Sequence, residues 1–211
     1  MKLVLLGVSG AGKGTQAKNI VKRYNIEHIS TGDILREHIK NQTPIGEKIQ
    51  HIIDSGNLVD DELVIEIVKE KLSRPECKNG YILDGFPRTL KQAIALSEFE
   101  DIDKAIYVMV DDRVVIERLT GRWICPDCAE MYHIKNLPPI NAGICDKCGS
   151  PLVQREDDKA ETVKERLRIF HELTEPIIDY YMEQHKLFAI PGHGNIDIIT
   201  NSILHTLDDL K

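Results

Sequence analysis

The sequence contains no apolar run that approaches the roughly 20 residues of a membrane span. We also expect no removable leader, because the first residues form an apolar strand that the following loop needs. No internal repeat or low-complexity tract is visible. These absences favour a globular protein of the cytoplasm.

A basic balance is absent as well, since 27 Lys and Arg stand against 34 Asp and Glu, for a net charge of −7. This charge argues against a general nucleic-acid surface, which needs a basic face. The net negative charge is compatible with a small anionic substrate, because arginines placed locally can bind it. With 211 residues, 42% hydrophobic and 29% charged, the chain can bury a core as one domain or as two small ones.

The most informative stretch runs from Lys2 to Thr15. It opens with Leu3–Leu6, an apolar run without polar alternation, which suits a strand buried on both faces of a parallel sheet. Four glycines follow within eight residues, together with Lys13 and Thr15, before a helical pattern. Such a loop turns backbone N–H groups and a helix N-terminus toward one point, which predicts a phosphate site with Lys13 on the outer phosphates.

Other interpretations of this loop compete with the phosphate site. The general phosphate-loop pattern has Ser or Thr directly after the lysine, whereas Gly14 intervenes here before Thr15. A dinucleotide-binding G-x-G-x-x-G pattern counted from Gly10 would require a last glycine where Thr15 stands. A glycine-rich turn without a ligand is the plainest alternative. The flanking strand and helix favour the phosphate site over it.

Strand and helix patterns alternate along the chain. Beyond the first strand we predict strands at 27–30, 81–84, 105–110 and 186–190. We predict helices at 16–24, 31–55 with a break at Thr43-Pro44, up to Leu72 with Asp60 or Asp61 as cap, and at 90–98, 112–119, 160–170, 175–184 and 197–210. The prediction is an α/β fold with a five-stranded parallel sheet flanked by helices, and with ligands at the carboxyl ends of the strands.

A second motif, Asp84-Gly85-Phe86-Pro87-Arg88-Thr89, ends the third strand. An acidic residue that ends a buried strand beside a phosphate loop is placed to hold Mg²⁺, directly or through water. Gly85 permits close approach of a ligand, and Arg88 can reach a phosphate. The alternative is an ordinary turn with a surface arginine.

Four arginines lie at or near the two ends of the segment 121–158: Arg118 before it, Arg122 and Arg155 at its two ends, and Arg166 after it. Like charges do not gather for stability, so arginines from separate segments suggest a polyphosphate between them. Solvated helix faces are the competing interpretation. Arg168 is assigned to the surface.

Cys125-x-x-Cys128 and Cys145-x-x-Cys148 are separated by sixteen residues. Two such knuckles predict a tetrahedral thiolate site for zinc. Disulfides compete, but nothing else indicates an oxidising compartment. Four sulfur ligands leave no open position for water, so the zinc would be structural. His133 could replace a ligand, and Cys77 is expected to be a free thiol.

The glycine loop and the Asp84–Arg88 segment resemble those of nucleoside monophosphate kinases. With the cysteine segment, essentially the whole chain resembles the long-lid adenylate kinases that carry zinc in the lid. One departure is Ser9, where that family commonly has proline; it affects loop stiffness and not the phosphate-facing N–H groups.

The resemblance implies roles for individual residues. The ATP-binding positions would be Gly10, Ala11, Gly12, Lys13, Gly14, Thr15, Arg118, Arg122, Met131, Tyr132 and Gly194. The AMP-binding positions would be Thr31, Arg36, Asn57, Leu58, Val59, Gly85, Phe86, Pro87, Arg88, Gln92, Arg155 and Arg166. The catalytic positions would be Lys13, Arg88, Arg122, Arg155 and Arg166, with Asp84 placing Mg²⁺ through water.

The expected organisation is a core of residues 1–29, 60–120 and 159–211, an AMP-binding insertion at 30–59 and a zinc-bearing lid at 121–158. The expected reaction is reversible, Mg²⁺-dependent phosphoryl transfer from ATP to AMP, which gives two ADP. The expected partners are these nucleotides alone, with no nucleic acid, no membrane and a monomeric chain.

Two rival functions remain. A UMP/CMP or other monophosphate kinase shares both loops, although the long lid argues against it. A nucleotide-switched zinc-ribbon protein could grip nucleic acid, but that interpretation needs basic and aromatic residues around the knuckles. Residues 123–151 offer two lysines and no arginine against Asp127, Glu130 and Asp146.

Overall fold

A computed structural model describes residues 1–209 of the chain. Its central sheet contains five parallel strands in the order β2-β3-β1-β4-β7. Their bounds are β1 Lys2–Leu6, β2 Glu27–Ser30, β3 Tyr81–Asp84, β4 Lys104–Met109 and β7 Leu187–Pro191. The predicted α/β fold with a five-stranded parallel sheet is confirmed. The carboxyl ends of β1 and β3 are neighbours, because Leu5 pairs with Asp84.

The sheet is buried on both faces, as the unbroken apolar run of β1 predicts. Leu3 and Leu5 pack into one hydrophobic cluster, whereas Val4 and Leu6 pack into another on the opposite face. Successive side chains of a strand point to opposite faces, so an apolar run without alternation supplies both cores.

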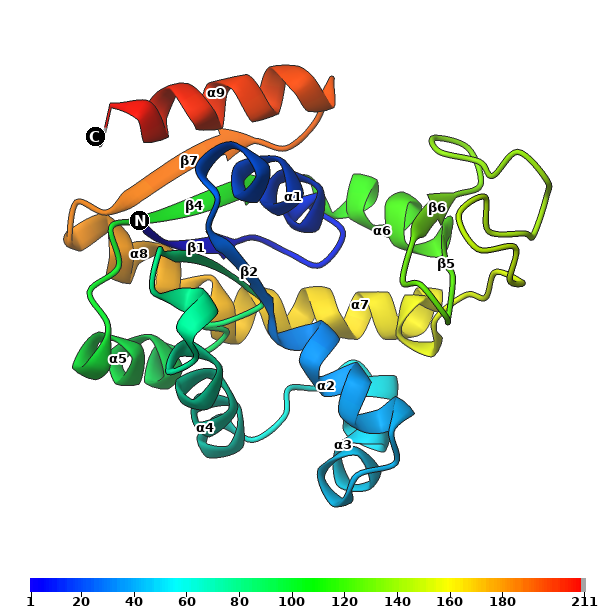
Figure 1. Ribbon diagram of the computed structural model, residues 1–211, viewed down its shortest axis with the longest axis horizontal. Coiled ribbons are helices and arrows are strands. Elements are labelled where there is room, and N and C mark those ends of the chain that lie inside the picture. Colours follow the sequence, from blue (N-terminus) through cyan, green and yellow to red (C-terminus); the bar gives the residue numbers. More distant parts are fainter. Residues whose placement is uncertain (210–211) are drawn as a thin grey trace.

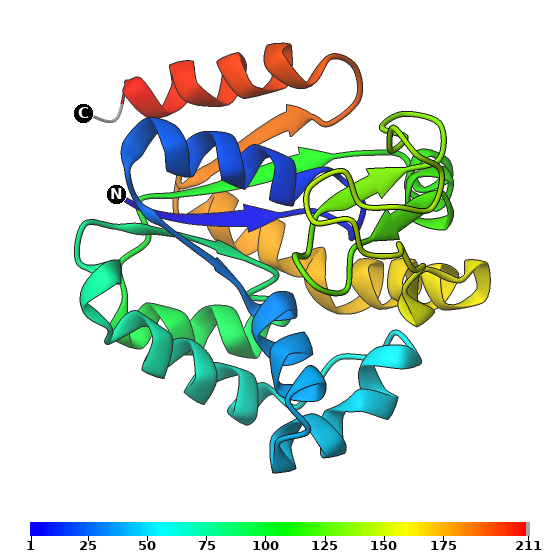
Figure 2. The same cartoon turned by 45° about the vertical axis from the view of Figure 1, so that its right-hand side comes forward.

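Helices form a layer on each side of the sheet (Figure 1). On one side lie α1 and α9, with α6 and α7 contributing to the same cluster; on the other lie α4, α5 and α8 (Figure 2). The bounds are α1 Lys13–Tyr24, α4 Asp61–Leu72, α5 Leu90–Phe99, α6 Asp112–Thr120, α7 Ala160–Ile169, α8 Pro176–Glu183 and α9 Ile196–Asp208.

Two helices, α2 Thr31–Lys40 and α3 Pro44–Asp54, project from the core between β2 and α4 (Figure 1). Capping residues set their starts. The Ser30 hydroxyl accepts from the Asp33 N–H at 3.2 Å, and the Thr43 hydroxyl accepts from the Gly46 N–H at 3.0 Å. Asp60 caps α4 through the Leu63 N–H. The predicted break at Thr43-Pro44 is therefore the start of a helix.

The cysteine segment contains little regular structure. It holds a short antiparallel pair, β5 Arg122–Ile124 and β6 Met131–His133, and is followed by a 3₁₀ turn at Glu156–Asp158. A second 3₁₀ turn lies at Pro75–Cys77. The sequence patterns predicted none of these short elements, because three residues are too few to show a period.

Helix boundaries differ from the predicted ones by a few residues. The first helix begins at Lys13 and not at Gln16, since the phosphate loop leads directly into it. A π-helical segment, Phe170–Thr174, joins α7 to α8, and the Glu175 N–H donates to the Phe170 carbonyl at 2.8 Å. Pro176 lacks the N–H that a continuous α-helix would need at that point, which favours the wider turn. Leu210, the predicted end of the last helix, lies outside the described residues.

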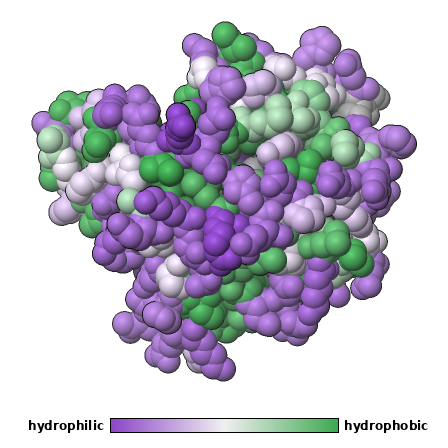
Figure 3. Space-filling view, turned by 180° about the vertical axis from the view of Figure 1, so that it is seen from behind, coloured by the Kyte–Doolittle hydropathy of each residue, from purple (hydrophilic) through white to green (hydrophobic). Residues whose placement is uncertain are grey.

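Figure 3 shows that hydrophilic residues dominate the face seen from behind, with apolar residues in separate patches. Among residues 1–209, no helix combines the length and apolar character that crossing a bilayer requires.

Candidate active site

The loop between β1 and α1 turns back on itself at its glycines. Gly7, Gly10 and Gly12 have positive φ angles of 135°, 86° and 98°. At Gly7 a Cβ atom would lie 2.6 Å from the Val108 carbonyl oxygen, so both the conformation and the space require glycine. Gly12 is also the N-cap of α1, and no side chain caps this helix. The helix therefore presents its N-terminal N–H groups to the loop, as an anion site requires.

Lys13 lies inside this loop, where its Nζ donates to the carbonyls of Gly7 at 2.8 Å and Val8 at 3.0 Å. Burial lowers its pKa to about 8; Asp84 opposes the shift, whereas Arg88 and other arginines add to it. The ammonium thus has carbonyl contacts but too little negative charge around it. A bound polyphosphate would supply the missing charge.

Asp84 ends β3 beside the loop. Burial alone would raise its pKa, but His28, Lys13 and Arg88 together hold the pKa of this carboxyl below its usual value. His28 Nε2 lies 3.6 Å from an Asp84 carboxylate oxygen. A carboxylate kept ionised next to a phosphate loop suits Mg²⁺ and its bound waters.

Arginines from several separate segments lie close enough to Lys13 and to one another to lower each other's pKa values. Burial lowers the pKa of Arg88 to about 10, with Arg166 as the next cause, and burial lowers that of Arg155 to about 10, with Arg36 and Arg122 adding to the effect. Burial likewise lowers the pKa of Arg166. Arginines that depress one another's pKa values are not solvated helix faces, and their arrangement favours a bound anion between them.

Two acidic residues hold part of this cluster, and the sequence reasoning gave them no role. Asp158 is fully buried and accepts from Arg122 Nε at 2.8 Å and Nη2 at 2.5 Å, with Arg166 Nη1 at 3.4 Å. Asp157 pairs with Arg166 at 2.8 Å. The run Arg155-Glu156-Asp157-Asp158 could have indicated this role. Carboxylates that directly follow a functional arginine are placed to orient other arginines of the same site.

A second cleft opens next to the loop. It is lined by residues of α2, of the loop before α4 and of the segment after β3, among them Thr31, Arg36, Asn57, Leu58, Val59, Gly85, Arg88, Gln92 and Arg166. An adjoining cleft contains Lys13, Pro87 and Arg88. Arg88 and Arg166 line both clefts, so the structure brings together most of the residues expected for AMP, whereas Lys13 is, within residues 1–209, the one residue expected for ATP that lines either cleft.

Several expected residues take other positions. The Arg118 guanidinium donates hydrogen bonds to the carbonyls of Gly10, Ala11 and Gly192 at 3.0–3.4 Å. Arg118 therefore stabilises the conformation of the phosphate loop. The Phe86 side chain is buried in the core. Gly194 lies in the loop between β7 and α9, in open space.

The two residues of β6 that are expected to bind ATP also differ from each other. A Cβ atom on Gly14 would come within 4.0 Å of the Met131 methyl carbon, so this side chain lies over the phosphate loop. Tyr132 is 7% exposed, and its hydroxyl accepts from the Asp146 N–H at 2.8 Å. Its side chain therefore belongs to the interior of the cysteine segment.

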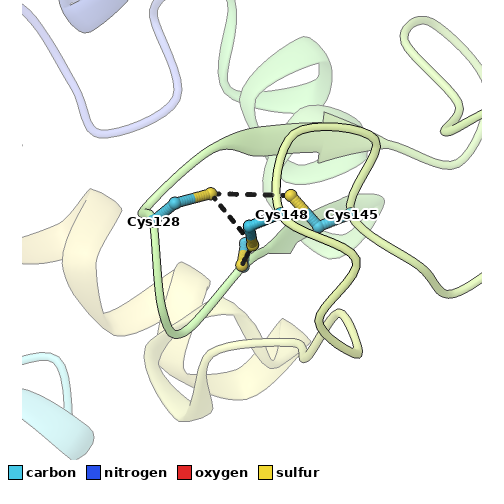
Figure 4. Close-up of side chains that lie close together, drawn as sticks. Cys128, Cys145 and Cys148 are labelled. Carbon is cyan, nitrogen blue, oxygen red and sulfur yellow. Dashed lines mark hydrogen bonds between the residues drawn. The ribbon is translucent and has the colours of Figure 1, made fainter.

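The four cysteines gather at one point. Figure 4 shows Cys128, Cys145 and Cys148 with their sulfur atoms turned toward one another. Cys125 completes the set, and all four sulfur atoms lie within 4.8 Å of one another. The nearest pair is 3.3 Å apart, too far for a disulfide at about 2.05 Å. A tetrahedral ion with bonds of about 2.3 Å would separate its ligands by about 3.8 Å, so the cluster fits a metal ion.

Comparison with known proteins identifies the family. The family model "Adenylate kinase" matches residues 5–186. The chain belongs to the adenylate kinase family. Curated adenylate kinases of Caldicellulosiruptor bescii and Clostridium perfringens SM101 are both 50% identical to it, over 98% and 100% of this chain and 99% and 100% of their own lengths. The adenylate kinase of Clostridium tetani is 51% identical, over 98% of both chains. Membership in this family makes the chain a phosphotransferase with nucleotide substrates.

Proposed function

We propose that this protein transfers the terminal phosphoryl group of ATP to AMP, reversibly, and so interconverts ATP and AMP with two ADP. The observation that carries the proposal is that Arg88 and Arg166 line both of two adjoining clefts, one of which also contains Lys13. One cleft contains the phosphate loop, and the other contains the residues expected for a monophosphate. A phosphoryl group passing between them would meet positive charge on all sides.

Phosphoryl transfer requires little covalent participation by the protein. Phosphoryl transfer depends on alignment of the two substrates and on neutralisation of the charge on the transferred group. Lys13 and the loop N–H groups bind the ATP phosphates, with Arg118 holding the loop in shape. Arg36 and Arg88 bind the AMP phosphate, and Arg122, Arg155 and Arg166 surround the group in transfer.

Two metal ions belong to the proposal. Asp84, an ionised carboxylate beside the loop, holds the waters of Mg²⁺, which accompanies ATP and shields its phosphates. Zinc occupies the cysteine cluster as a structural ion, because four thiolates complete its coordination.

The organisation into moving parts is also part of the proposal. Residues 121–158 form a lid that closes over ATP, and residues 30–59 form the insertion that carries AMP. Closure excludes water, which would otherwise hydrolyse ATP without a productive acceptor.

A coupled assay of ADP formation from ATP with AMP, GMP, UMP or CMP tests the function. We expect kcat/KM for AMP to exceed that for each other monophosphate by at least about tenfold. Faster turnover with UMP or CMP would assign the protein to the rival monophosphate-kinase activity. A folded, metal-loaded protein that turns over none of the four would refute the proposal.

A further inference from the structure

The side-chain amide of Gln92 forms part of the wall of the second cleft, and both of its ends are engaged. Gln92 is 2% exposed. Its Nε2 donates to an Asp61 carboxylate oxygen at 2.8 Å, and its Oε1 accepts from the Arg88 backbone N–H at 2.7 Å. Asp61 is the first residue of α4, directly after the loop Asn57–Val59 that lines the same cleft.

These two partners fix which way the amide points. A carboxylate only accepts hydrogen bonds and a backbone N–H only donates, so turning the amide by 180° would lose both contacts. Thr89 holds the Asp61 carboxylate in place, because the Thr89 hydroxyl lies 3.1 Å from both carboxylate oxygens. The same hydroxyl accepts a hydrogen bond from the backbone N–H of Gln92. The orientation of the Gln92 amide is thus set by neighbouring protein groups and not by a ligand.

The fixed amide retains one N–H on Nε2 and one lone pair on Oε1 for a ligand. Adenine offers the matching pair, a 6-amino donor next to a ring-nitrogen acceptor. Hypoxanthine has the same size but carries an acceptor oxygen at position 6. An amide free to turn could serve either base, whereas one held in a single orientation favours the 6-amino purine.

We propose that Asp61 is a specificity-determining residue, which selects a 6-amino over a 6-oxo purine monophosphate by locking the Gln92 amide. This inference rests on the proposed function, in which Gln92 faces the base of the monophosphate. Asp61 acts through Gln92 and is a positioning residue; it does not touch the base.

The test compares AMP with IMP as acceptors in the unmodified protein and in Asp61→Asn. The asparagine can donate as well as accept, so the Gln92 amide can turn, opposed only by the Arg88 N–H. We expect the ratio of kcat/KM for AMP to that for IMP to fall by about tenfold in the variant. Glu62→Gln is the matched control, since exposed Glu62 pairs with Lys91 at the surface, and its ratio should equal that of the unmodified protein.

The outcomes separate this inference from the proposed function. A protein inactive with AMP refutes the function, whereas a protein active with AMP but equally active with IMP overturns only the role of Asp61. Equal losses for both substrates in Asp61→Asn indicate a merely structural role and also overturn it. If thermal unfolding shows that this variant does not fold, Asp61→Ser, whose hydroxyl donates and accepts, should show the same fall in the ratio. An unchanged ratio there overturns the inference.

Discussion

The Lys13 ammonium is buried close to the guanidinium groups of Arg88 and Arg166. Its burial and the arginines around it lower its pKa to about 8, and its Nζ turns back to the Gly7 and Val8 carbonyls. A binding site that lacks its anion is expected to show such unfavourable electrostatics. Two measurable consequences follow for this one residue.

Binding of ATP should take up protons near pH 8. In the free protein Lys13 is about half protonated at pH 8, because its pKa is about 8. The phosphates favour the charged ammonium and raise this pKa, so the complex binds about half a proton more. Calorimetry in buffers of different ionisation enthalpy measures the uptake, and Lys13→Met should lack this contribution. Equal proton uptake in the two proteins would contradict the assignment.

Lys13→Met should also stabilise the free protein while it destroys activity. The folded pKa of about 8 lies below the unfolded value of about 10.4, so the unfolded state binds more protons between them, and the free energy of unfolding rises with pH over this range. Below pH 8 the folded state bears the full cost of the buried charge. We expect Lys13→Met to be more stable there by about 1–2 kcal/mol, with transfer reduced at least a hundredfold.

Denaturant unfolding at pH 7 and pH 10.5, together with the coupled assay, checks both expectations. The stability difference should shrink at the higher pH, where Lys13 is neutral in the folded protein. A variant with normal turnover would remove Lys13 from the phosphate site.

Single residues differ in how far the sequence revealed them. Gly7, Lys13, Asp84 and Arg88 lie within local motifs whose spacing carries the chemistry. Asp61 and Asp158 do not, because their roles depend on partners such as Gln92 and Arg122, which lie 31 and 36 positions away. No local pattern records such a pairing.

Among the elements, the cysteine segment is the least able to fold by itself. Its hydrophobic cluster contains only Cys125, Tyr132, Cys145 and Leu152 as buried members, and its two strands have three residues each. So small a core cannot offset the conformational entropy of the segment, and a metal ion bound by the four cysteines would supply the missing stability.

Cys125→Ser should therefore release the metal and lower the melting temperature by about 5 °C or more. Differential scanning calorimetry with metal analysis measures both effects. Cys77→Ser is the matched control, because Cys77 lies outside the cluster and should leave the metal content unchanged. Loss of activity in Cys125→Ser without any loss of stability would instead indicate a catalytic metal.

Helices and strands whose apolar residues recur with a clear period were predictable from the sequence, and elements without such a period were not. The strand at Tyr81–Asp84 and the helix that ends at Leu72 occur as predicted. The pair β5 and β6 and the π-helical segment depend on tertiary packing and on Pro176, and periodicity does not show them.

At the scale of the whole molecule, the cysteine segment contacts α2. Lys40, the last residue of α2, donates from Nζ to the Pro126 carbonyl at 2.9 Å, within the first cysteine knuckle. The Lys18 Nζ of α1 lies 3.8 Å from a carboxylate oxygen of Glu130, which also belongs to the cysteine segment. The cysteine segment therefore contacts both α2 and α1 in this conformation.

Lys40→Met should weaken the coupling between the two substrates. When the contact is lost, lid closure no longer supports the insertion, so a non-hydrolysable ATP analogue should raise AMP affinity about threefold less than in the unmodified protein. AMP titrations by calorimetry with and without the analogue measure the coupling. Lys48→Met, at an exposed position of α3, is the control and should retain the coupling. Identical coupling in the two variants would exclude the Lys40 contact as its carrier.

The sequence by itself determined the phosphate loop, the second motif, the cysteine knuckles and the alternation of strands and helices. Each of these is local, since backbone conformation and ligand spacing are set over a few residues. Only the tertiary structure decided that Arg118 hydrogen-bonds to the loop carbonyls, that the Tyr132 side chain is buried within the cysteine segment and that Asp61 holds Gln92. Those relations arise when distant segments pack together, because packing selects which side chains meet and which face a ligand.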